Sequence, residues 1–340
     1  MSLPRPRVPL PHRILLIQKG ALGDVVLTTA LLDDLHRAFP GAVIDFAVGR
    51  AAAPLLEHHP LVHETVIVDA APAWRLAPDI RARRYDWVVD VQSSARTALL
   101  TAWSGARVRI GWDARVRRAA YTHRLSRDRP PEYVVRERRR LLTLAGIATG
   151  DTPPHLELTA AERSEGERRL RDAGVPAGLP VVGLLLSTVE APKNWPLDHF
   201  ARLIPMLRAA GATPVVFHAP GEDERVARLR ERAPTAIVLP EMGLRAFLGT
   251  LASCTVLVSG DTGPAHMADV LGIARVTIFG PTSPAAWVPP GGRAIALASA
   301  NPPILSMRAR KRALGTREDY TADVTPEQVL DAVRGLIGTR

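Results

Sequence analysis

The chain is short of cysteine, of aromatic residues and of long apolar runs. Its single cysteine, Cys254, cannot form an internal disulfide, and the first residues lack the apolar core of a secretory signal. We therefore expect a reducing, cytoplasmic compartment. No stretch approaches the roughly 18 uninterrupted apolar residues of a membrane-spanning helix, so none is expected. Aromatic residues make up only 5% of the chain and no nucleic-acid recognition motif is present, which argues against a nucleic-acid binder.

Lysine is scarce as well, because only three of the 44 basic residues are lysines. In a chain that uses arginine nearly everywhere, a remaining lysine indicates a position where a compact ammonium is needed in place of a planar guanidinium. Lys311 stands in a run of basic residues, whereas Lys19 and Lys193 fall in the two segments that carry the predicted chemistry. With so few lysines, coincidence is the alternative explanation.

Length and charge bound the class of protein. The 340 residues, 46% of them hydrophobic, suffice for two domains with packed cores. The net charge of +10 is concentrated in residues 1–150, which hold 23 basic and 14 acidic side chains, and residues 81–140 alone hold 16 arginines. This basic field predicts an anionic partner, which could be a membrane surface, a phosphorylated substrate or a nucleic acid. The alternative is a solvated surface in an arginine-rich protein.

Short apolar runs alternate with amphipathic helical segments, which is typical of parallel α/β units. In the first half, we predict strands at 13–18, 42–48, 64–69 and 86–91, an irregular segment at 105–131, and helices at 23–39, 75–83, 93–103 and 132–144. In the second half, we predict strands at 181–186, 213–218, 236–240, 255–260 and 275–280, and helices at 198–210, from 222, at 244–252 and at 264–271. Thr325, Pro326 and Glu327 are typical of the start of a final helix.

The predicted fold class is therefore α/β, with two doubly wound domains facing each other across a cleft. Residues 150–180 are rich in proline, glycine and charge, and we interpret them as the interdomain connection with one surface helix. The predicted domains are residues 1–175 and 176–340. We also consider that the C-terminal helix, about residues 326–337, packs back on the first domain. Ligands of such sheets bind beyond the carboxyl ends of the strands.

The first segment with predicted chemistry is QKGALGDVV, residues 18–26, which follows the first strand. Gly20 and Gly23 permit a tight turn from strand to helix, and Asp24 falls on the first helical turn. Asp24 is either a general base or simply a favourable acid at a helix N-terminus. The full G-x-G-x-x-G fingerprint is absent, which disfavours a Rossmann-type oxidoreductase.

The second set of candidates follows four successive strands of the second half. They are small, hydroxylated or charged residues: Ser187, Thr188, Lys193, Glu222, Asp261, Thr262, Gly263, His266, Gly280 and Thr282. Backbone N–H groups at a helix N-terminus, hydroxyl groups and one ammonium are the groups that hold a diphosphate. Taken singly, each has a structural alternative: Ser187 and Thr262 as helix caps, Glu222 as a first-turn acid, and His266 as a core histidine.

The chain resembles glycosyltransferase family 9, the lipopolysaccharide heptosyltransferases, over nearly its whole length. The motifs that carry the resemblance are KGALGDVVLTTALL, YDWVVDVQSSARTALL, RIGW, KNWPLDHFARL and SGDTGPAHMADVLGIARVTIFGPTSP. The resemblance implies a GT-B architecture of two Rossmann-like domains. It also implies inverting transfer of L-glycero-D-manno-heptose from an ADP-linked donor to the inner core of lipopolysaccharide.

The resemblance further implies roles for individual residues. Asp24 becomes the general base, and Lys193 stabilises the departing ADP. The nucleotide-sugar contacts are the diphosphate-binding Ser187, Thr188, Lys193, Thr262 and Gly263, Glu222 at the ribose, Met242 at the adenine, Asp261 at the heptose, and His266 and Thr282 near the sugar or phosphate. The implied acceptor is a lipid that bears phosphates and Kdo carboxylates at the inner membrane surface. Its binding is assigned to Lys19, Gly23, Arg96, Arg109 and Arg118.

Neither a D-x-D pair nor a His/Cys cluster is present, so we expect no metal and no cofactor besides the ADP-heptose substrate. The chain departs from many relatives in lacking cysteines near 300–315, which leaves the heptose position open. Three alternatives therefore remain: transfer of a different sugar, a homologue that binds the nucleotide without turnover, and nucleic-acid binding.

Overall fold

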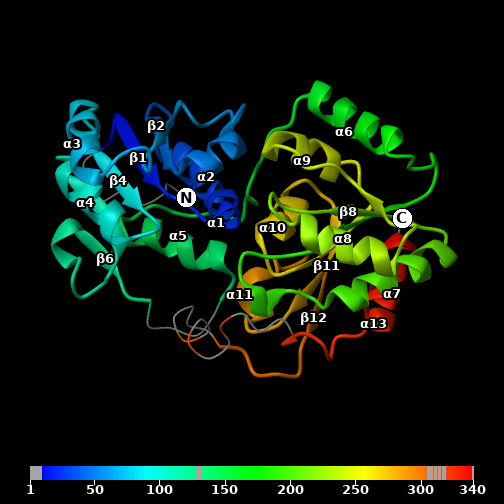
Figure 1. The fold of residues 1–340 in the computed structure, drawn as a ribbon. Coiled ribbons are helices and arrows are strands. Elements are labelled where there is room, and N and C mark those ends of the chain that lie inside the picture. The colour runs from blue at the N-terminus through cyan, green and yellow to red at the C-terminus, as the bar shows by residue number, and fades with distance from the viewer. Residues whose placement is uncertain are drawn as a thin grey trace. The chain divides into compact units, whose positions relative to one another are not determined.

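The computed structural model describes residues 10–127, 132–304 and 319–338, together with positions 309, 312 and 315. The chain divides into two compact units, residues 1–157 and 158–340 (Figure 1). The boundary lies N-terminal to the predicted one, which had assigned the helix within residues 150–180 to the first domain. About half of the segment 300–320 lies outside the described residues.

The first unit contains six strands and the helices that connect them. Its elements are β1 (Arg13–Ile17), α1 (Leu22–Thr28), α2 (Ala30–Ala38), β2 (Val43–Val48), η1 (Arg50–Leu56), β3 (Glu64–Ile67), α3 (Ala73–Ala82), β4 (Trp87–Asp90), α4 (Ala95–Trp103), β5 (Val108–Trp112), η2 (Arg118–Ala120), β6 (His123–Leu125) and α5 (Val134–Leu144).

The second unit repeats this alternation. Its elements are α6 (Ala160–Asp172), β7 (Val181–Leu185), η3 (Ala191–Lys193), α7 (Leu197–Ala209), β8 (Thr213–Phe217), α8 (Asp223–Arg232), β9 (Ile237–Val238), α9 (Leu244–Leu251), β10 (Val256–Gly260), α10 (Gly263–Val270), β11 (Ala274–Phe279), α11 (Pro284–Trp287), β12 (Ala294–Ala298) and α13 (Pro326–Gly338). Within the described residues, no helix is both long and apolar enough to cross a membrane.

Both sheets have the same topology. The strand order is β3-β2-β1-β4-β5-β6 in the first and β12-β11-β10-β7-β8-β9 in the second, and the paired strands are parallel. Counted within each unit, both orders are the 3-2-1-4-5-6 order of a Rossmann fold. The two Rossmann-like halves predicted from the sequence are therefore confirmed.

The strands are continuous apolar runs because helices cover both faces of a parallel sheet. All residues of β4, β7, β8, β10 and β11 are buried. The core of the second unit joins these strands to α7, and to the apolar face of α13 through Val329, Leu330, Val333 and Leu336. The C-terminal helix thus buries its apolar face within its own unit, in contrast to the packing on the first domain that we had considered.

The segment 105–131, predicted to be irregular, contains two strands, β5 and β6. Arg109 is the one polar side chain of β5, and it donates hydrogen bonds to the carbonyl oxygens of Ala120 and Ala106, at 2.8 and 2.7 Å. This arginine, among many in the segment, concealed the strand. The edge strand β12 was likewise not predicted.

The helix predicted to continue to Phe39 is divided at Thr29 into α1 and α2. The hydroxyl groups of Thr28 and Thr29 donate to the carbonyl oxygens of Asp24 and Val26, each at 2.7 Å. Such hydroxyls compete with backbone N–H groups for helical carbonyls and favour a local bend.

Helix α6 belongs to the second unit because it packs on α9 (Figure 1). A Cβ at Gly166 would lie 2.1 Å from the carbonyl oxygen of Gly249, so only glycine permits this approach. Arg245 of α9 also donates two hydrogen bonds to Glu162, each 2.6 Å long. These contacts explain why the domain boundary precedes α6.

Candidate functional site

Each sheet has a topological switch point, where strand order reverses. It lies between β1 and β4 in the first unit and between β7 and β10 in the second. The loops that follow these strands diverge at the carboxyl edge, which is where doubly wound sheets bind ligands.

At the first switch point, two glutamines connect the loops that follow β1 and β4. The side-chain nitrogen of Gln18 donates to the carbonyl oxygen of Gly20 at 2.9 Å and to Gln92 Oε1 at 3.3 Å. Gln92 Oε1 also accepts from the Gly20 amide at 3.1 Å. These bonds hold the turn that leads into α1. Sequence analysis did not single out either glutamine, although Gln18 ends one predicted strand and Gln92 directly follows another.

Asp24 lies in the first turn of α1 and forms an ion pair with Arg138 of α5. The Arg138 side chain is 6% exposed and that of Asp24 is 29% exposed. Arg138 also donates to the carbonyl oxygen of Asp24 at 2.6 Å and to Thr28 Oγ1 at 2.8 Å. Asp24 is therefore more than a helix-terminal acid, because a buried cation from a distant helix fixes it.

Sequence analysis missed Arg138, but a signal was present. The buried residues of α5 are Val134, Val135, Arg138, Arg139, Leu141 and Leu142. The two arginines occupy positions of the apolar stripe of an amphipathic helix. An arginine in such a position needs a buried acidic partner, which Asp24 and Asp34 provide.

The residues assigned to the acceptor have varied surroundings. Lys19 is half-buried in the loop after β1, and Gly23 is buried in α1. Arg96 donates to the carbonyl oxygens of Val68 and Ala71, and Arg109 makes the loop contacts described above. Arg118 pairs with Asp113 at 2.8 Å. The three arginines thus have roles in loop structure or surface pairing, and acceptor binding by this set stays a prediction.

At the second switch point, Lys193 lies between two carboxylates. Its ammonium donates to Asp261 Oδ2 at 3.0 Å and lies 3.3 Å from Glu190 Oε1. Lys193 follows β7 and Asp261 follows β10, so the ion pair joins the two loops that diverge here. A Cβ at Gly260 would lie 2.5 Å from the Lys193 carbonyl oxygen, so glycine is required for the η3 turn to approach β10.

Asp261 is a buried charge, with 4% of its side chain exposed. Burial raises the pKa of its carboxyl group, but the charges of Lys193 and His266 and the hydrogen bond from Lys193 outweigh burial and lower the pKa below its usual range. His266 is buried in α10, with its ring centroid 5.5 Å from that of Trp287. The structure thus brings together the predicted residues Lys193, Asp261, His266 and Thr282.

Thr262 and Gly263 begin α10 next to this cluster. Thr262 occupies the N-cap position, but its side chain makes no capping hydrogen bond, which disfavours the alternative of an ordinary cap. The first amides of a helix have no intrahelical acceptor, and the helix dipole favours an anion there. The start of α10 and the Lys193 ammonium therefore form a favourable place for a diphosphate.

The remaining candidates lie at the same edge of the sheet. Ser187 and Thr188 follow β7, and Thr188 Oγ1 donates to the Glu190 carbonyl oxygen at 2.8 Å. Glu222 follows β8 and accepts from the Ala219 amide at 2.7 Å, while Met242 follows β9 and its sulfur accepts from Thr250 at 3.7 Å. Because β8 and β9 lie beyond β7 in the sheet, Glu222 and Met242 are displaced sideways from Lys193.

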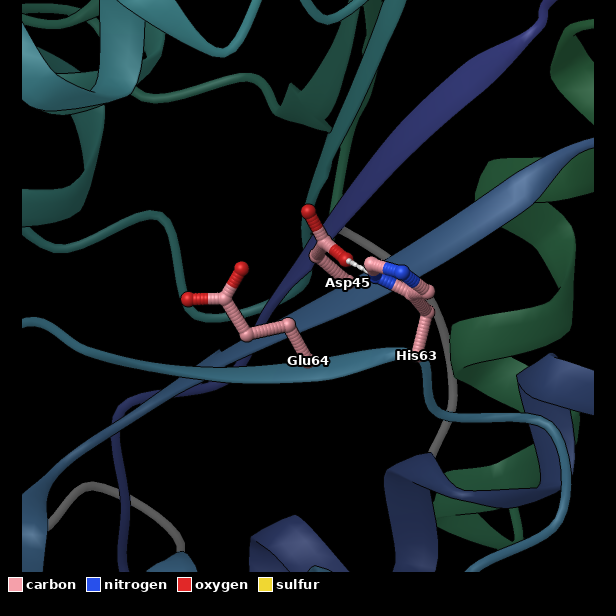
Figure 2. A group of neighbouring side chains, drawn as sticks. All are labelled: Asp45, His63 and Glu64. Atoms are coloured by element: carbon pink, nitrogen blue, oxygen red, sulfur yellow. Dashed lines mark hydrogen bonds and ion pairs between the residues drawn. The ribbon is translucent and has the colours of Figure 1, made fainter.

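In the first unit, Asp45, His63 and Glu64 come close enough to share a metal ion, with ligand atoms within 4.8 Å of one another (Figure 2). Hydrogen-bond donors already occupy the oxygens, however. Arg13 and Tyr85 each donate to Asp45 Oδ2 at 2.8 Å, and Arg83 donates to both oxygens of Glu64. The group is therefore an ion-pair network, which we call the Asp45 network, and these donors disfavour a cation.

Comparison with known proteins agrees with this geometry. The family model described as Glycosyltransferase family 9 (heptosyltransferase) matches residues 73–315. Lipopolysaccharide heptosyltransferase 1 of Escherichia coli strain K12 is 28% identical over 291 residues, which cover 80% of this chain and 89% of that relative. Lipopolysaccharide heptosyltransferase 2 of Salmonella typhimurium is 26% identical over 348 residues, covering 96% and 98%.

Among solved structures, E. coli ADP-heptose LPS heptosyltransferase II superimposes with a TM-score of 0.77 at 23% identity, covering 96% of this chain and 98% of that one. The two Rossmann-like units give the chain the fold of this solved structure, and the family match makes it a glycosyltransferase of the GT-B class. The chain belongs to glycosyltransferase family 9, the heptosyltransferase family.

Proposed function

We propose that this enzyme transfers L-glycero-D-manno-heptose from an ADP-linked donor to the inner core of lipopolysaccharide, with inversion. The acceptor hydroxyl attacks the anomeric carbon, and a new glycosidic bond forms as the bond from that carbon to the β-phosphate oxygen breaks. The hydroxyl proton passes to Asp24, and ADP leaves with the bonding electrons. The names of the relatives support this choice of donor and acceptor.

The observation that carries the proposal is the Lys193–Asp261 pair beside the start of α10. The leaving ADP gains negative charge on its β-phosphate, and a preorganised ammonium and helix N-terminus stabilise such charge. Lys193 is 13% exposed, so its charge acts in a setting that water screens poorly. Glu222 is assigned to the ribose hydroxyls, Met242 to the adenine, and Asp261 to the heptose hydroxyls.

The proposed acceptor is an anionic lipid-linked sugar at the cytoplasmic face of the inner membrane. The excess of basic residues in 1–150 supports an anionic partner. We place the acceptor near Asp24, with Lys19 as the first of the basic residues to test, because the half-buried Lys19 lies in the loop that leads to Asp24. No metal is required in this proposal, since Lys193 and the helix N-terminus supply the positive charge.

The test is an assay of ADP release with ADP-heptose and Kdo-lipid A, or heptosyl-Kdo-lipid A, in the presence of EDTA. We expect wild-type release to need the acceptor and to withstand EDTA. Asp24→Asn should lower kcat about 10³-fold, because a positioned general base contributes 10²–10⁴. Glu57→Gln, an exposed change in the same unit, is the matched control and should leave kcat unchanged.

Results other than these would favour one of the alternative functions or another role for Asp24. Turnover with another nucleotide sugar but not ADP-heptose would retain the family and change the donor. ADP binding without turnover on any acceptor would indicate an inactive homologue. Wild-type kcat in Asp24→Asn would remove Asp24 from the role of base, and tight, salt-sensitive binding of oligonucleotides would favour the nucleic-acid alternative.

A further inference from the structure

Arg138 contacts the candidate base through both ends of its guanidinium group. One terminal nitrogen donates to the Asp24 carbonyl oxygen at 2.6 Å and to Thr28 Oγ1 at 2.8 Å. The other terminal nitrogen donates to Asp24 Oδ1. One planar group therefore holds the main chain and the side chain of the same residue, which fixes the direction of the carboxylate relative to α1.

The contact with Arg138 leaves the second carboxylate oxygen of Asp24 available to accept a proton. Arg138 binds Oδ1, and within the described part of the chain no hydrogen bond is formed to Oδ2 of Asp24. The Asp24 side chain is 29% exposed, so solvent or a ligand reaches it, whereas that of Arg138 is 6% exposed. A general base needs this arrangement, with one oxygen held and one oxygen within reach of the proton.

We propose that Arg138 is the positioning residue of the general base, which holds Asp24 through Oδ1 so that Oδ2 receives the acceptor proton. This inference rests on the proposed function, since it assumes the role of Asp24 as base. Arg138 acts through Asp24 and touches no substrate. Sequence position alone does not single out Arg138, because it is one of four arginines in residues 136–140.

The chemistry of the contact requires arginine. The planar guanidinium presents its N–H groups in a rigid fork, so one group bridges Asp24 and Thr28 at fixed angles. A lysine ammonium could neutralise the carboxylate but could not hold both partners in the same geometry. Arg138→Lys therefore separates positioning from simple neutralisation of charge.

The neighbouring residue Arg139 provides a matched control. It is also buried on α5, with 8% of its side chain exposed, and it pairs with the buried Asp34 at 2.8 Å. It also donates to the Thr152 carbonyl oxygen at 2.6 Å. Arg139 thus has the same burial and the same kind of partner, but its partner has no proposed part in the reaction.

The experiment is a double-mutant cycle on kcat for ADP release. Arg138→Ala should lower kcat about 10²-fold, less than the loss on removing the base itself, with little change in the KM for ADP-heptose. In the Asp24→Asn background, Arg138→Ala should cause no further loss, because a residue that acts through Asp24 has nothing left to position. Arg139→Ala should lower the stability of the fold. Below its unfolding transition, its kcat should equal that of the wild type.

Two further variants keep the test decisive if Arg138→Ala folds poorly. Arg138→Lys should retain the fold and lose about tenfold in kcat, because charge is kept and the fork is lost. Millimolar guanidinium should restore turnover to Arg138→Ala by occupying the vacated space, and it should not accelerate Arg139→Ala. Circular dichroism and thermal unfolding establish that each variant is folded under the assay conditions.

The outcomes distinguish this inference from the proposed function. Two results with an active wild type would overturn the inference and leave the proposed function standing. In the first, the losses in kcat of Asp24→Asn and Arg138→Ala multiply in the double variant. In the second, Arg138→Ala retains full kcat. If the wild type releases no ADP with either acceptor, the proposed function fails. Mass spectrometry of carbodiimide coupling then decides whether Arg138 holds Asp24, since Arg138→Ala should label Asp24 faster than the wild type and equal labelling would contradict the contact.

Discussion

Two buried aspartates, one in each unit, contrast a charge within a sheet with a charge of the proposed site. Asp45 is fully buried and Asp261 is 4% exposed, and both have a carboxyl pKa below the usual range. Asp45 stands in the amino-terminal half of β2, within the sheet. Asp261 stands directly beyond the carboxyl end of β10, at the switch point of its sheet.

The partners of the two aspartates differ in kind as well. For Asp45, burial raises the pKa, and hydrogen bonds from Arg13, Tyr85 and His63 outweigh it, so that several fixed donors fill the carboxylate. Asp261 has a lysine, a mobile point charge that can turn toward another anion. The carboxyl-edge position of Asp261 and the flexible stem of its lysine partner support the proposed ligand site in the second unit.

The comparison is tested most strongly by removing each cation. Lys193→Met should lower kcat about 10³-fold, because the loss of one preorganised charge from a transition state costs about 3–4 kcal/mol. It should also lower the unfolding temperature, because the buried Asp261 loses its cation. Arg13→Met, the matched change in the Asp45 network, should leave kcat unchanged and lower the unfolding temperature. Kinetics and thermal unfolding of both variants measure this contrast, and equal kinetic losses would contradict it.

The sequence was sufficient for the fold class because the strands are apolar runs of a length typical of parallel sheets. It was also sufficient to bring Lys193 and Asp261 into one candidate site, since both follow strands and such strand ends share an edge. It did not reveal β5, because Arg109 interrupts the apolar pattern and is satisfied only by tertiary contacts with Ala106 and Ala120.

The partner of Asp24 was beyond sequence reasoning for a related reason. Residues 136–140 offer four arginines, and only the packing of α5 against α1 decides which of them meets Asp24. The spacing of buried positions in α5 restricts the choice to Arg138 and Arg139. Selection between these two depends on the three-dimensional placement of Asp24 and Asp34, which belong to different helices.

A second variant tests the structural role of Asp45 by removing its charge. Asp45→Asn should lower the free energy of unfolding by about 2–3 kcal/mol, somewhat less than a fully buried pair, because Arg13 remains 31% exposed to water. Turnover of the folded variant should equal that of the wild type. Denaturant unfolding and kinetics on the same preparation measure both quantities, and a large drop in kcat with unchanged stability would reverse the assignment.

Another buried aspartate, Asp90, shows the effect of burial on the carboxyl pKa where no arginine of the described residues is hydrogen-bonded to the carboxylate. It lies at the carboxyl end of β4 and accepts from the Ser93 amide and the Tyr121 hydroxyl, each at 2.8 Å. These neutral donors do not offset the loss of hydration, so burial raises the pKa of the Asp90 carboxyl to about 6. Asp45 and Asp90 thus share one sheet and full burial, and the presence or absence of arginine sets the direction of their pKa shifts.

The pH dependence of stability follows from the sign of this shift. The Asp90 carboxyl binds its proton more tightly in the folded chain than in the unfolded one, so its contribution is complete below pH 3.8 and is lost as pH rises through about 6. Asp90→Asn does not titrate there, so the free energy of unfolding of the variant minus that of the wild type should increase between pH 4 and pH 7. The change should be about 2 kcal/mol, by the relation of one pKa unit to roughly 1.4 kcal/mol. Denaturant unfolding of both proteins across this pH range measures it; a difference that is constant with pH would mean that Asp90 is charged throughout, as Asp45 is.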